Sequence, residues 1–214
     1  MPEYCFVRGE MPQQLAFEMR LPTTWNKRTV FLGGGGFDGS TTPPGPFSPS
    51  VYPSGYATIS TNHGHDGATT PGATFALDPG MLADYAYLAV PRVLAPAKAI
   101  LGERFGIGFT GTKMVYEGCS GGGRQGLIEA QRYPDLFDGV ISRAPANSYT
   151  GQFLWYQKLA KQLAQPGAAL SEAKIRTIGN AVLAKCDALD GLVDKVIGNP
   201  NACTFDPGDR KSVV

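Results

Sequence analysis

Ser120 lies in the stretch Gly118-Cys119-Ser120-Gly121-Gly122, which fits the pattern G-x-S-x-G. Residues 112–117 before it predict a strand, and residues 124–133 after it predict a helix. In that context the pattern is typical of a nucleophile elbow, a sharp strand-to-helix turn that exposes a serine hydroxyl. Glycines on both sides leave room for so tight a turn. We therefore predict Ser120 as a nucleophile, with the Gly121 N–H as a donor to a developing oxyanion.

A second oxyanion donor is expected from the loop after an early strand. The run Gly33–Gly36, called the glycine loop below, follows a predicted strand at residues 28–32. Backbone without side chains lets N–H groups approach a substrate carbonyl, and we predict Gly35 as the donor. One alternative is a turn without chemistry. Another is a phosphate-binding loop, but the GxxxxGK[ST] pattern of such a loop is absent.

The base that would activate Ser120 has no evident candidate, because His63 and His65 are the two histidines of the chain. Both precede Ser120, whereas hydrolases with this elbow have the order Ser, Asp or Glu, then His. We expect structural roles for both. The array His63-Gly64-His65-Asp66 also leaves a metal site open as an alternative, although two imidazoles at this spacing are a weak signal.

Composition limits the classes of function. The chain has 214 residues, a formal net charge of +1 and 43% hydrophobic residues, which suits one soluble globular domain or one domain plus part of another. A balanced charge gives no electrostatic case for nucleic acid or for an anionic membrane, and the apolar runs are too short to cross a bilayer. We therefore expect neither as a partner, and the oligomeric state stays undetermined.

Strand and helix patterns alternate through the first two thirds of the chain, which predicts an α/β fold with a mostly parallel sheet and flanking helices. Residues 84–105 favour a helix that Pro91 and Pro96 bend or break. After Pro145 the pattern changes to helices at 152–165 and 171–185. We therefore divide the chain into a domain at 1–146 and the start of a second at 147–214.

Several motifs together resemble the tannase and feruloyl esterase family, which includes mono(2-hydroxyethyl) terephthalate hydrolase, and the likeness covers nearly the whole chain. The most specific is the Cys-Ser pair followed by Gly-Gly-Gly-Arg-Gln. Lys27 and the pair Val90-Pro91 depart from the family pattern, away from the catalytic positions. The matching segments are Tyr4–Gly9, Leu21–Asn26, the glycine loop, Gly55–His65, Tyr116–Gln125 and Tyr133–Val140.

The resemblance implies an α/β-hydrolase with an inserted lid domain, secreted or periplasmic. It implies that Cys119 forms a disulfide with a cysteine next to the catalytic histidine, and this bond would explain why a cysteine directly precedes Ser120. That cysteine, the histidine and the catalytic acid are expected beyond residue 214. Cys5 resembles a family cysteine whose partner lies upstream, so we expect a chain truncated at both ends. Cys186 and Cys203 match a family disulfide, which would stabilise the loop by roughly 3 kcal/mol.

Residues 186–196 are rich in carboxylates around a glycine. Hard oxygen ligands suit Ca²⁺, although the stretch does not fit an EF-hand and could be a solvated acidic turn. The resemblance implies a structural calcium site of the lid. Its ligands would be the side chains of Asp187, Asp190 and Asp194 and the main-chain carbonyls of Leu192 and Val196.

The sequence therefore favours a serine-type ester hydrolase that acts through an acyl-enzyme on small esters of aromatic acids, such as feruloyl or galloyl esters. The alternative is a catalytically incomplete fragment, or a calcium-binding partial domain, that lacks the Asp and His of the triad and is inactive by itself. A third possibility, an acyltransferase on the same scaffold, shares every residue named above.

Overall fold

The computed structural model of the protein describes residues 3–41, 54–106 and 111–209. Contacts divide the chain into two compact units, residues 1–149 and 150–214. The boundary expected from the sequence, between residues 146 and 147, lies close to this division. The two units are described separately below.

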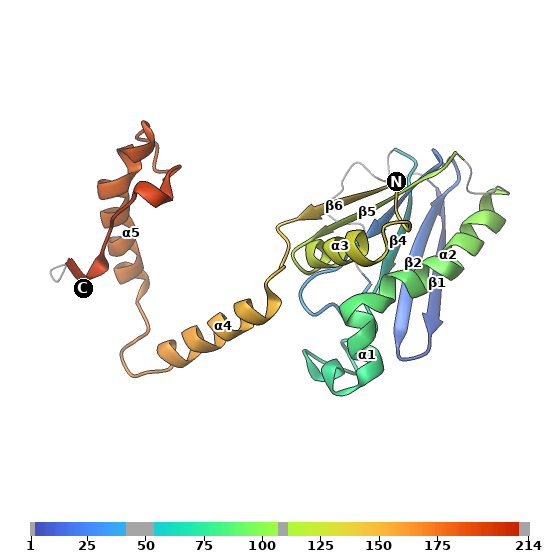
Figure 1. Ribbon diagram of the computed structural model, residues 1–214, viewed down its shortest axis with the longest axis horizontal. Coiled ribbons are helices and arrows are strands. Elements are labelled where there is room, and N and C mark those ends of the chain that lie inside the picture. Colours follow the sequence, from blue (N-terminus) through green and yellow to red (C-terminus); the bar gives the residue numbers. More distant parts are fainter. Residues whose placement is uncertain (1–2, 42–53, 107–110, 210–214) are drawn as a thin grey trace. The chain divides into compact units, whose positions relative to one another are not determined.

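Unit 1 is built on a sheet of six strands in the order β1-β2-β4-β3-β5-β6 (Figure 1). The pairs β1–β2 and β2–β4 are antiparallel, and β3 pairs in parallel with both β4 and β5, as β5 does with β6. The expected α/β class and flanking helices are confirmed, although the sheet is mixed. The strands are β1 (Tyr4–Met11), β2 (Leu15–Pro22), β3 (Arg28–Leu32), β4 (Ala57–Thr61), β5 (Lys113–Cys119) and β6 (Gly139–Arg143).

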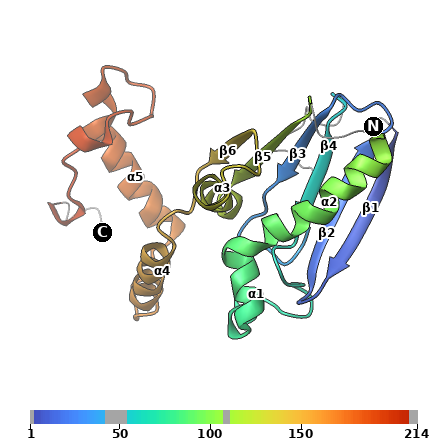
Figure 2. The ribbon, with the colours of Figure 1, turned by 45° about the vertical axis from the view of Figure 1, so that its right-hand side comes forward.

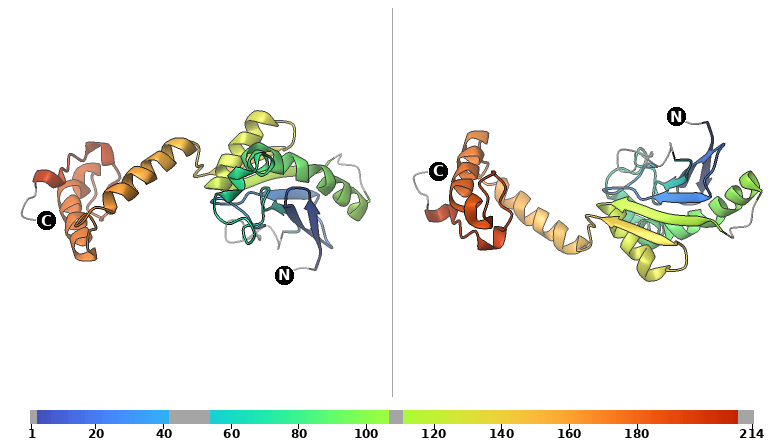
Figure 3. Two further views of the ribbon diagram at one scale, coloured as in Figure 1. Left: turned by 90° about the horizontal axis from the view of Figure 1, so that it is seen from below. Right: turned by 90° about the horizontal axis from the view of Figure 1, so that it is seen from above.

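Two helices, α2 (Ala89–Phe105) and α3 (Gly121–Arg132), cover the same face of the sheet (Figures 1 and 3). Figure 2 shows α2 running along the sheet beside β2 and β4. Three short elements precede α2, and their bounds are η1 (Thr74–Leu77), α1 (Pro79–Ala83) and the π-helical turn η2 (Asp84–Leu88).

The core lies between these helices and the sheet. Phe31 on β3, Ile59 on β4 and Tyr116 on β5 are fully buried, and so is the inward face of α2 at Val93 and Leu101. Side chains alternate along a strand, so the neighbours of Phe31 in β3 face the opposite side of the sheet, where they form a smaller cluster. This packing fixes β3 and β5 side by side.

The structure adds one strand to the elements expected from the sequence and corrects the expected break in a helix. Residues 4–11 were not predicted as a strand, yet β1 pairs with β2 over eight residues. The helix α2 continues through Pro96 without a break. Pro91 lies in the first turn of α2, directly after the π-helical turn η2, and packing of the buried face supports the turn at Pro96.

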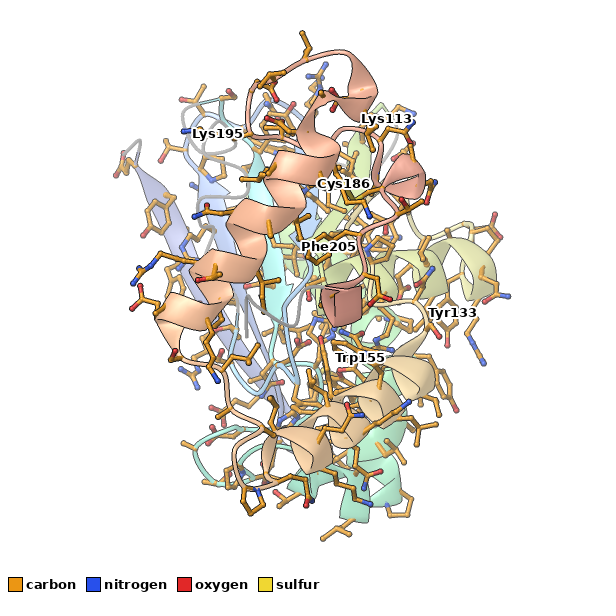
Figure 4. The ribbon with its side chains drawn as sticks, turned by 90° about the vertical axis from the view of Figure 1, so that its left-hand side faces the viewer. Lys113, Tyr133, Trp155, Cys186, Lys195 and Phe205 are labelled. Carbon is orange, nitrogen blue, oxygen red and sulfur yellow. A yellow bond between two sulfur atoms is a disulfide. The ribbon has the colours of Figure 1, made fainter. Side chains whose placement is uncertain are left out.

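Unit 2 contains most of α4 (Tyr149–Leu163) and all of α5 (Glu172–Cys186), followed by short 3₁₀ turns η3 (Asp187–Asp190), η4 (Pro200–Ala202) and η5 (Pro207–Asp209). Ser171 caps α5, because its side chain accepts a hydrogen bond from Lys174 N–H. Cys186 ends α5 (Figure 4) and forms a disulfide with Cys203, the pairing that the resemblance implied. No helix among the described residues combines the length and the apolar character that a membrane span requires.

Candidate functional site

The two glycine-rich segments of the sequence meet at one edge of the sheet. The glycine loop follows β3 and Ser120 follows β5, and these strands are parallel neighbours with Leu32 opposite Glu117. Gly33 N–H extends the ladder by donating to Glu117 O at 2.7 Å. Carboxyl ends of adjacent parallel strands meet at the same edge, so segments far apart in the sequence become neighbours.

Ser120 has the strained backbone that a nucleophile elbow requires, with φ 58° and ψ −115°. The residue is exposed, and no other described residue makes a hydrogen bond to its side chain. Gly118 and Gly122 touch across the turn, since a Cβ on Gly118 would lie 2.5 Å from Gly122 C and O. No side chain fits at either position, which explains the two glycines of the pattern.

Hydrogen bonds fix the carbonyls of the glycine loop. Gly34 O accepts from Gly122 N–H at 3.0 Å, and Gly35 O accepts from Asp38 N–H at 2.9 Å. Gly36 O accepts from the Tyr85 hydroxyl at 3.0 Å. The loop is therefore tied both to the helix that begins after Ser120 and to η2.

Backbone N–H groups beside Ser120 are left without partners. The N–H groups of Gly35, Gly36 and Gly121 have no acceptor among the described residues, and Gly35 and Gly36 are exposed. A Cβ built on Gly121 would lie 3.2 Å from Gly36 N, so the donors come from adjoining segments. The N–H of Gly121 also lies at a helix N-terminus, which favours negative charge. This arrangement can bind an oxyanion, and it makes Gly36 a candidate beside Gly35.

Two tyrosines and an arginine buttress the far end of the glycine loop. The hydroxyls of Tyr85 and Tyr149 are 2.5 Å apart, and that of Tyr149 lies 3.4 Å from Gly36 O. The Arg124 guanidinium lies over both rings, at 4.7 Å from the Tyr85 centroid and 5.2 Å from that of Tyr149. Burial raises the pKa of Tyr85, so its hydroxyl keeps the proton that it donates.

Neither histidine is placed to activate Ser120. Both are 1% exposed. His63 Nε2 lies 3.3 Å from Asp38 Oδ2, at an angle that does not make a hydrogen bond. Burial lowers the pKa of His63 to about 3, so the two groups do not form an ion pair at neutral pH. His65 stacks on Phe75 with ring centroids 4.4 Å apart.

Glu129, on α3, is a buried carboxyl with an unpartnered oxygen. It is 1% exposed, and its Oε2 has no hydrogen-bond partner among the described residues. Burial raises the pKa of Glu129 from 4.5 to about 8. The folded protein therefore keeps this proton at neutral pH, while the unfolded chain has lost it.

This difference predicts that Glu129 lowers stability as the pH rises. Between pH 4.5 and 8 only the folded state binds the proton, so the free energy of unfolding falls by up to roughly 1.4 kcal/mol per pH unit. Glu129→Gln removes this dependence. Urea unfolding at pH 5 and pH 8 should show the variant gaining stability relative to wild type at the higher pH. Glu103→Gln, at an exposed position of α2, is the matched control, and equal pH slopes for Glu129→Gln and wild type would contradict the expectation.

The predicted calcium ligands share one loop after α5. Asp187 Oδ1 accepts from Lys195 N–H, Asp190 accepts from Leu192 and Gly198 N–H, and Asp194 Oδ1 accepts from Val196 N–H. The N–H groups of Leu192 and Gly198 lower the pKa of Asp190. Within the described ranges, however, no three histidine, cysteine or acidic side chains lie close enough together to hold a metal ion. The calcium site, including a carbonyl ligand from Val196, therefore stays a prediction, and the histidine array gains no support.

The free cysteines of the described residues are Cys5, which is exposed, and Cys119, which is partly buried. The predicted partner of Cys119 lies outside the chain, so its disulfide stays a prediction.

Reasoning from the sequence did not identify Asp38, Tyr85 or Gln125 as parts of the site. Asp38 had a signal, because an aspartate between turn residues in Gly-Phe-Asp-Gly is typical of a side chain that organises a turn.

Comparisons with known proteins agree with this geometry. The sequence matches the family described as "Tannase and feruloyl esterase" over residues 4–213. It is 35% identical over 194 residues to a probable feruloyl esterase B-1 of Aspergillus fumigatus, covering 89% of this chain and 35% of that protein. It is 32% identical to mono(2-hydroxyethyl) terephthalate hydrolase of Piscinibacter sakaiensis, covering 97% of this chain and 40% of that protein.

Solved structures of proteins with related names have a similar fold. Feruloyl esterase B from Aspergillus oryzae superposes with a TM-score of 0.80 at 28% identity, covering 95% of this chain and 40% of that one. Tannin acyl hydrolase from Aspergillus niger superposes with a TM-score of 0.73, also at 28% identity, covering 95% and 39%. The fold is that of the α/β-hydrolases. The chain spans less than half the length of these relatives. Because its sequence matches the family over residues 4–213, this chain belongs to the tannase and feruloyl esterase family of ester hydrolases.

Proposed function

We propose that this chain carries the nucleophile and the oxyanion donors of a serine esterase that acts on esters of aromatic acids, such as feruloyl or galloyl esters. The observation that supports this most is the exposed, strained Ser120 beside the free N–H groups of Gly35, Gly36 and Gly121. The substrate class rests on its relatives, whose names refer to esters of ferulic acid, terephthalic acid and tannin.

In this proposal Ser120 Oγ attacks the ester carbonyl, and its proton passes to a general base. The oxyanion that forms accepts hydrogen bonds from the N–H groups of Gly121 and of the glycine loop, with Gly35 as our first choice. Collapse of the tetrahedral intermediate breaks the bond to the alcohol, which leaves with a proton. Water then attacks the acyl-enzyme and releases the acid.

The base is the part of this mechanism that the described residues do not supply. His63 and His65 are buried, and neither is hydrogen-bonded to Ser120. This supports the alternative that the 214-residue chain alone is catalytically incomplete. The predicted Asp and His beyond residue 214 would complete the triad.

The experiment compares the 214-residue chain with the full-length protein, meaning this chain with any flanking coding sequence. Both are assayed on methyl ferulate and on an aliphatic methyl ester. We expect hydrolysis of the aromatic ester by the full-length protein alone. Equal turnover of the two esters would contradict the aromatic substrate class. Analysis of products with a competing alcohol separates hydrolysis from acyl transfer.

We also propose that the loop after α5 binds a structural Ca²⁺ through Asp187, Asp190, Asp194 and the carbonyls of Leu192 and Val196. Three carboxylates and two carbonyls are the hard oxygen donors that Ca²⁺ prefers. The same unit holds the Cys186–Cys203 disulfide, and a disulfide of this kind supports a secreted or periplasmic location.

Calcium is therefore expected to stabilise unit 2. At a free concentration a hundredfold above Kd, binding adds about 2.7 kcal/mol to the free energy of unfolding. Thermal unfolding should move to higher temperature in CaCl₂ than in EDTA, and Asp194→Asn should reduce this difference. Asp206→Asn, in the same unit but outside the proposed ligand set, is the control. Superimposable melting curves in CaCl₂ and EDTA would contradict the site.

A further inference from the structure

Asp38 organises the turn that ends the glycine loop. Its N–H donates to Gly35 O at 2.9 Å, and its backbone has a positive φ of 58°. Its carboxyl lies against the loop itself, since a Cβ on Gly34 would come within 2.8 Å of it. The side chain is fully buried. The carboxyl therefore fills the space directly beneath the backbone that presents the free N–H groups.

Gln125 connects this carboxyl to the elbow. It lies on α3, is 3% exposed, and donates from Nε2 to Asp38 Oδ2 at 2.6 Å. Its Oε1 accepts from the Tyr116 hydroxyl at 2.9 Å, and that hydroxyl is also 3.0 Å from Gly122 O. A continuous buried chain of polar contacts thus joins the glycine loop, α3 and β5.

The glycine loop needs such a support because it has no side chains of its own to pack. The proposed oxyanion donors belong to two separate segments, the loop after β3 and the start of α3. Their separation therefore depends on what connects these segments. The connections are the Gly122 N–H to Gly34 O bond and the buried contact between Asp38 and Gln125.

We propose that Asp38 and Gln125 are positioning residues, which hold the glycine loop at the distance from Gly121 that oxyanion binding requires. The inference rests on the proposed esterase function. Neither side chain touches the substrate. They act through the backbone of Gly34 and Gly35, so they control the rate of the chemical step more than the binding of the ester.

The protonation of the cluster indicates which substitution is tolerated. Burial raises the pKa of Asp38 to about 7, and His63 stays neutral because burial lowers its pKa to about 3. Asp38 Oδ2 faces both groups, because it accepts from Gln125 Nε2 and lies 3.3 Å from His63 Nε2, which has no hydrogen-bond partner among the described residues. The amide oxygen of asparagine can take the place of Oδ2 and accept from Gln125 Nε2, and asparagine tolerates a positive φ. Asp38→Asn should therefore preserve the arrangement.

The test measures kcat and KM on methyl ferulate in the full-length protein. Gln125→Met keeps the length of the side chain but removes both hydrogen bonds, and we expect kcat to fall about 100-fold with KM within about twofold. Asp38→Asn should stay within about fivefold of the wild-type kcat, since its hydrogen bonds are retained. If Gln125→Met does not fold, Gln125→Asn, which is too short to reach Asp38, takes its place.

Asp84→Asn is the matched control, because Asp84 is equally buried but pairs with Arg92 instead of the glycine loop. It is expected to lower the melting temperature and to leave kcat of the folded protein unchanged. A wild-type kcat for Gln125→Met, or an equal loss of kcat in Asp84→Asn, would overturn the inference. The proposed function fails separately, if Ser120→Ala retains full activity.

Discussion

Ser120→Ala is expected to lower kcat on methyl ferulate by roughly a million-fold in the full-length protein. The substitution removes the attacking oxygen, so no acyl-enzyme can form and only the binding and oxyanion contributions remain. Those contributions alone keep a rate roughly 10³- to 10⁴-fold above that in water. KM should change little, because the hydroxyl of Ser120 contributes to bond formation more than to ester binding.

Ser171→Ala provides the matched serine control. The Ser171 side chain accepts a hydrogen bond from Lys174 N–H at the start of α5. Loss of this cap is expected to destabilise unit 2 by about 1 kcal/mol and to leave kcat unchanged. Trapping of the acyl-enzyme followed by mass spectrometry identifies the modified residue. An adduct on any residue other than Ser120, or equal rates for Ser120→Ala and wild type, would refute the nucleophile.

The elbow could be predicted from the sequence because its chemistry is local. A serine between close glycines, after a strand and before a helix, leaves few other structures, and the backbone of Ser120 has the expected strain. The glycine loop could be predicted for a different reason. Its position after a short apolar strand indicates the edge of a parallel sheet, and the pairing of β3 with β5 places it beside the elbow.

The supports of the site could not be predicted, because they depend on contacts between distant segments. Asp38 meets Gln125 across 87 positions, and Tyr85 meets Tyr149 across 64. Nothing in the local sequence around any of these four residues indicates its partner. The continuous helix through Pro96 was missed for a related reason, since local propensity disfavours proline but burial of the face around Val93 and Leu101 decides the outcome.

Gly122→Ala is expected to have the second largest effect, because it separates the two halves of the oxyanion site. A Cβ at this position would lie 2.6 Å from Gly34 O, the atom that accepts the Gly122 N–H, and 3.0 Å from Gly33 C. Both contacts are with backbone, so no side chain can rotate away. We expect kcat to fall at least about 100-fold, and the free energy of unfolding to fall by about 1–3 kcal/mol.

Gly139→Ala separates this steric effect from the general effect of replacing a glycine. Gly139 begins β6, has no positive φ, and a Cβ there would meet no atom within 4 Å. This variant should be as stable as wild type or slightly more so, because glycine weakens a strand, and its kcat should not change. Assays well below the melting temperatures of Gly122→Ala and Gly139→Ala ensure that only folded protein is compared. If Gly122→Ala then turned over methyl ferulate at the wild-type rate, the glycine loop could not be a partner of Gly121 in binding the oxyanion, since the added methyl group forces the two segments apart.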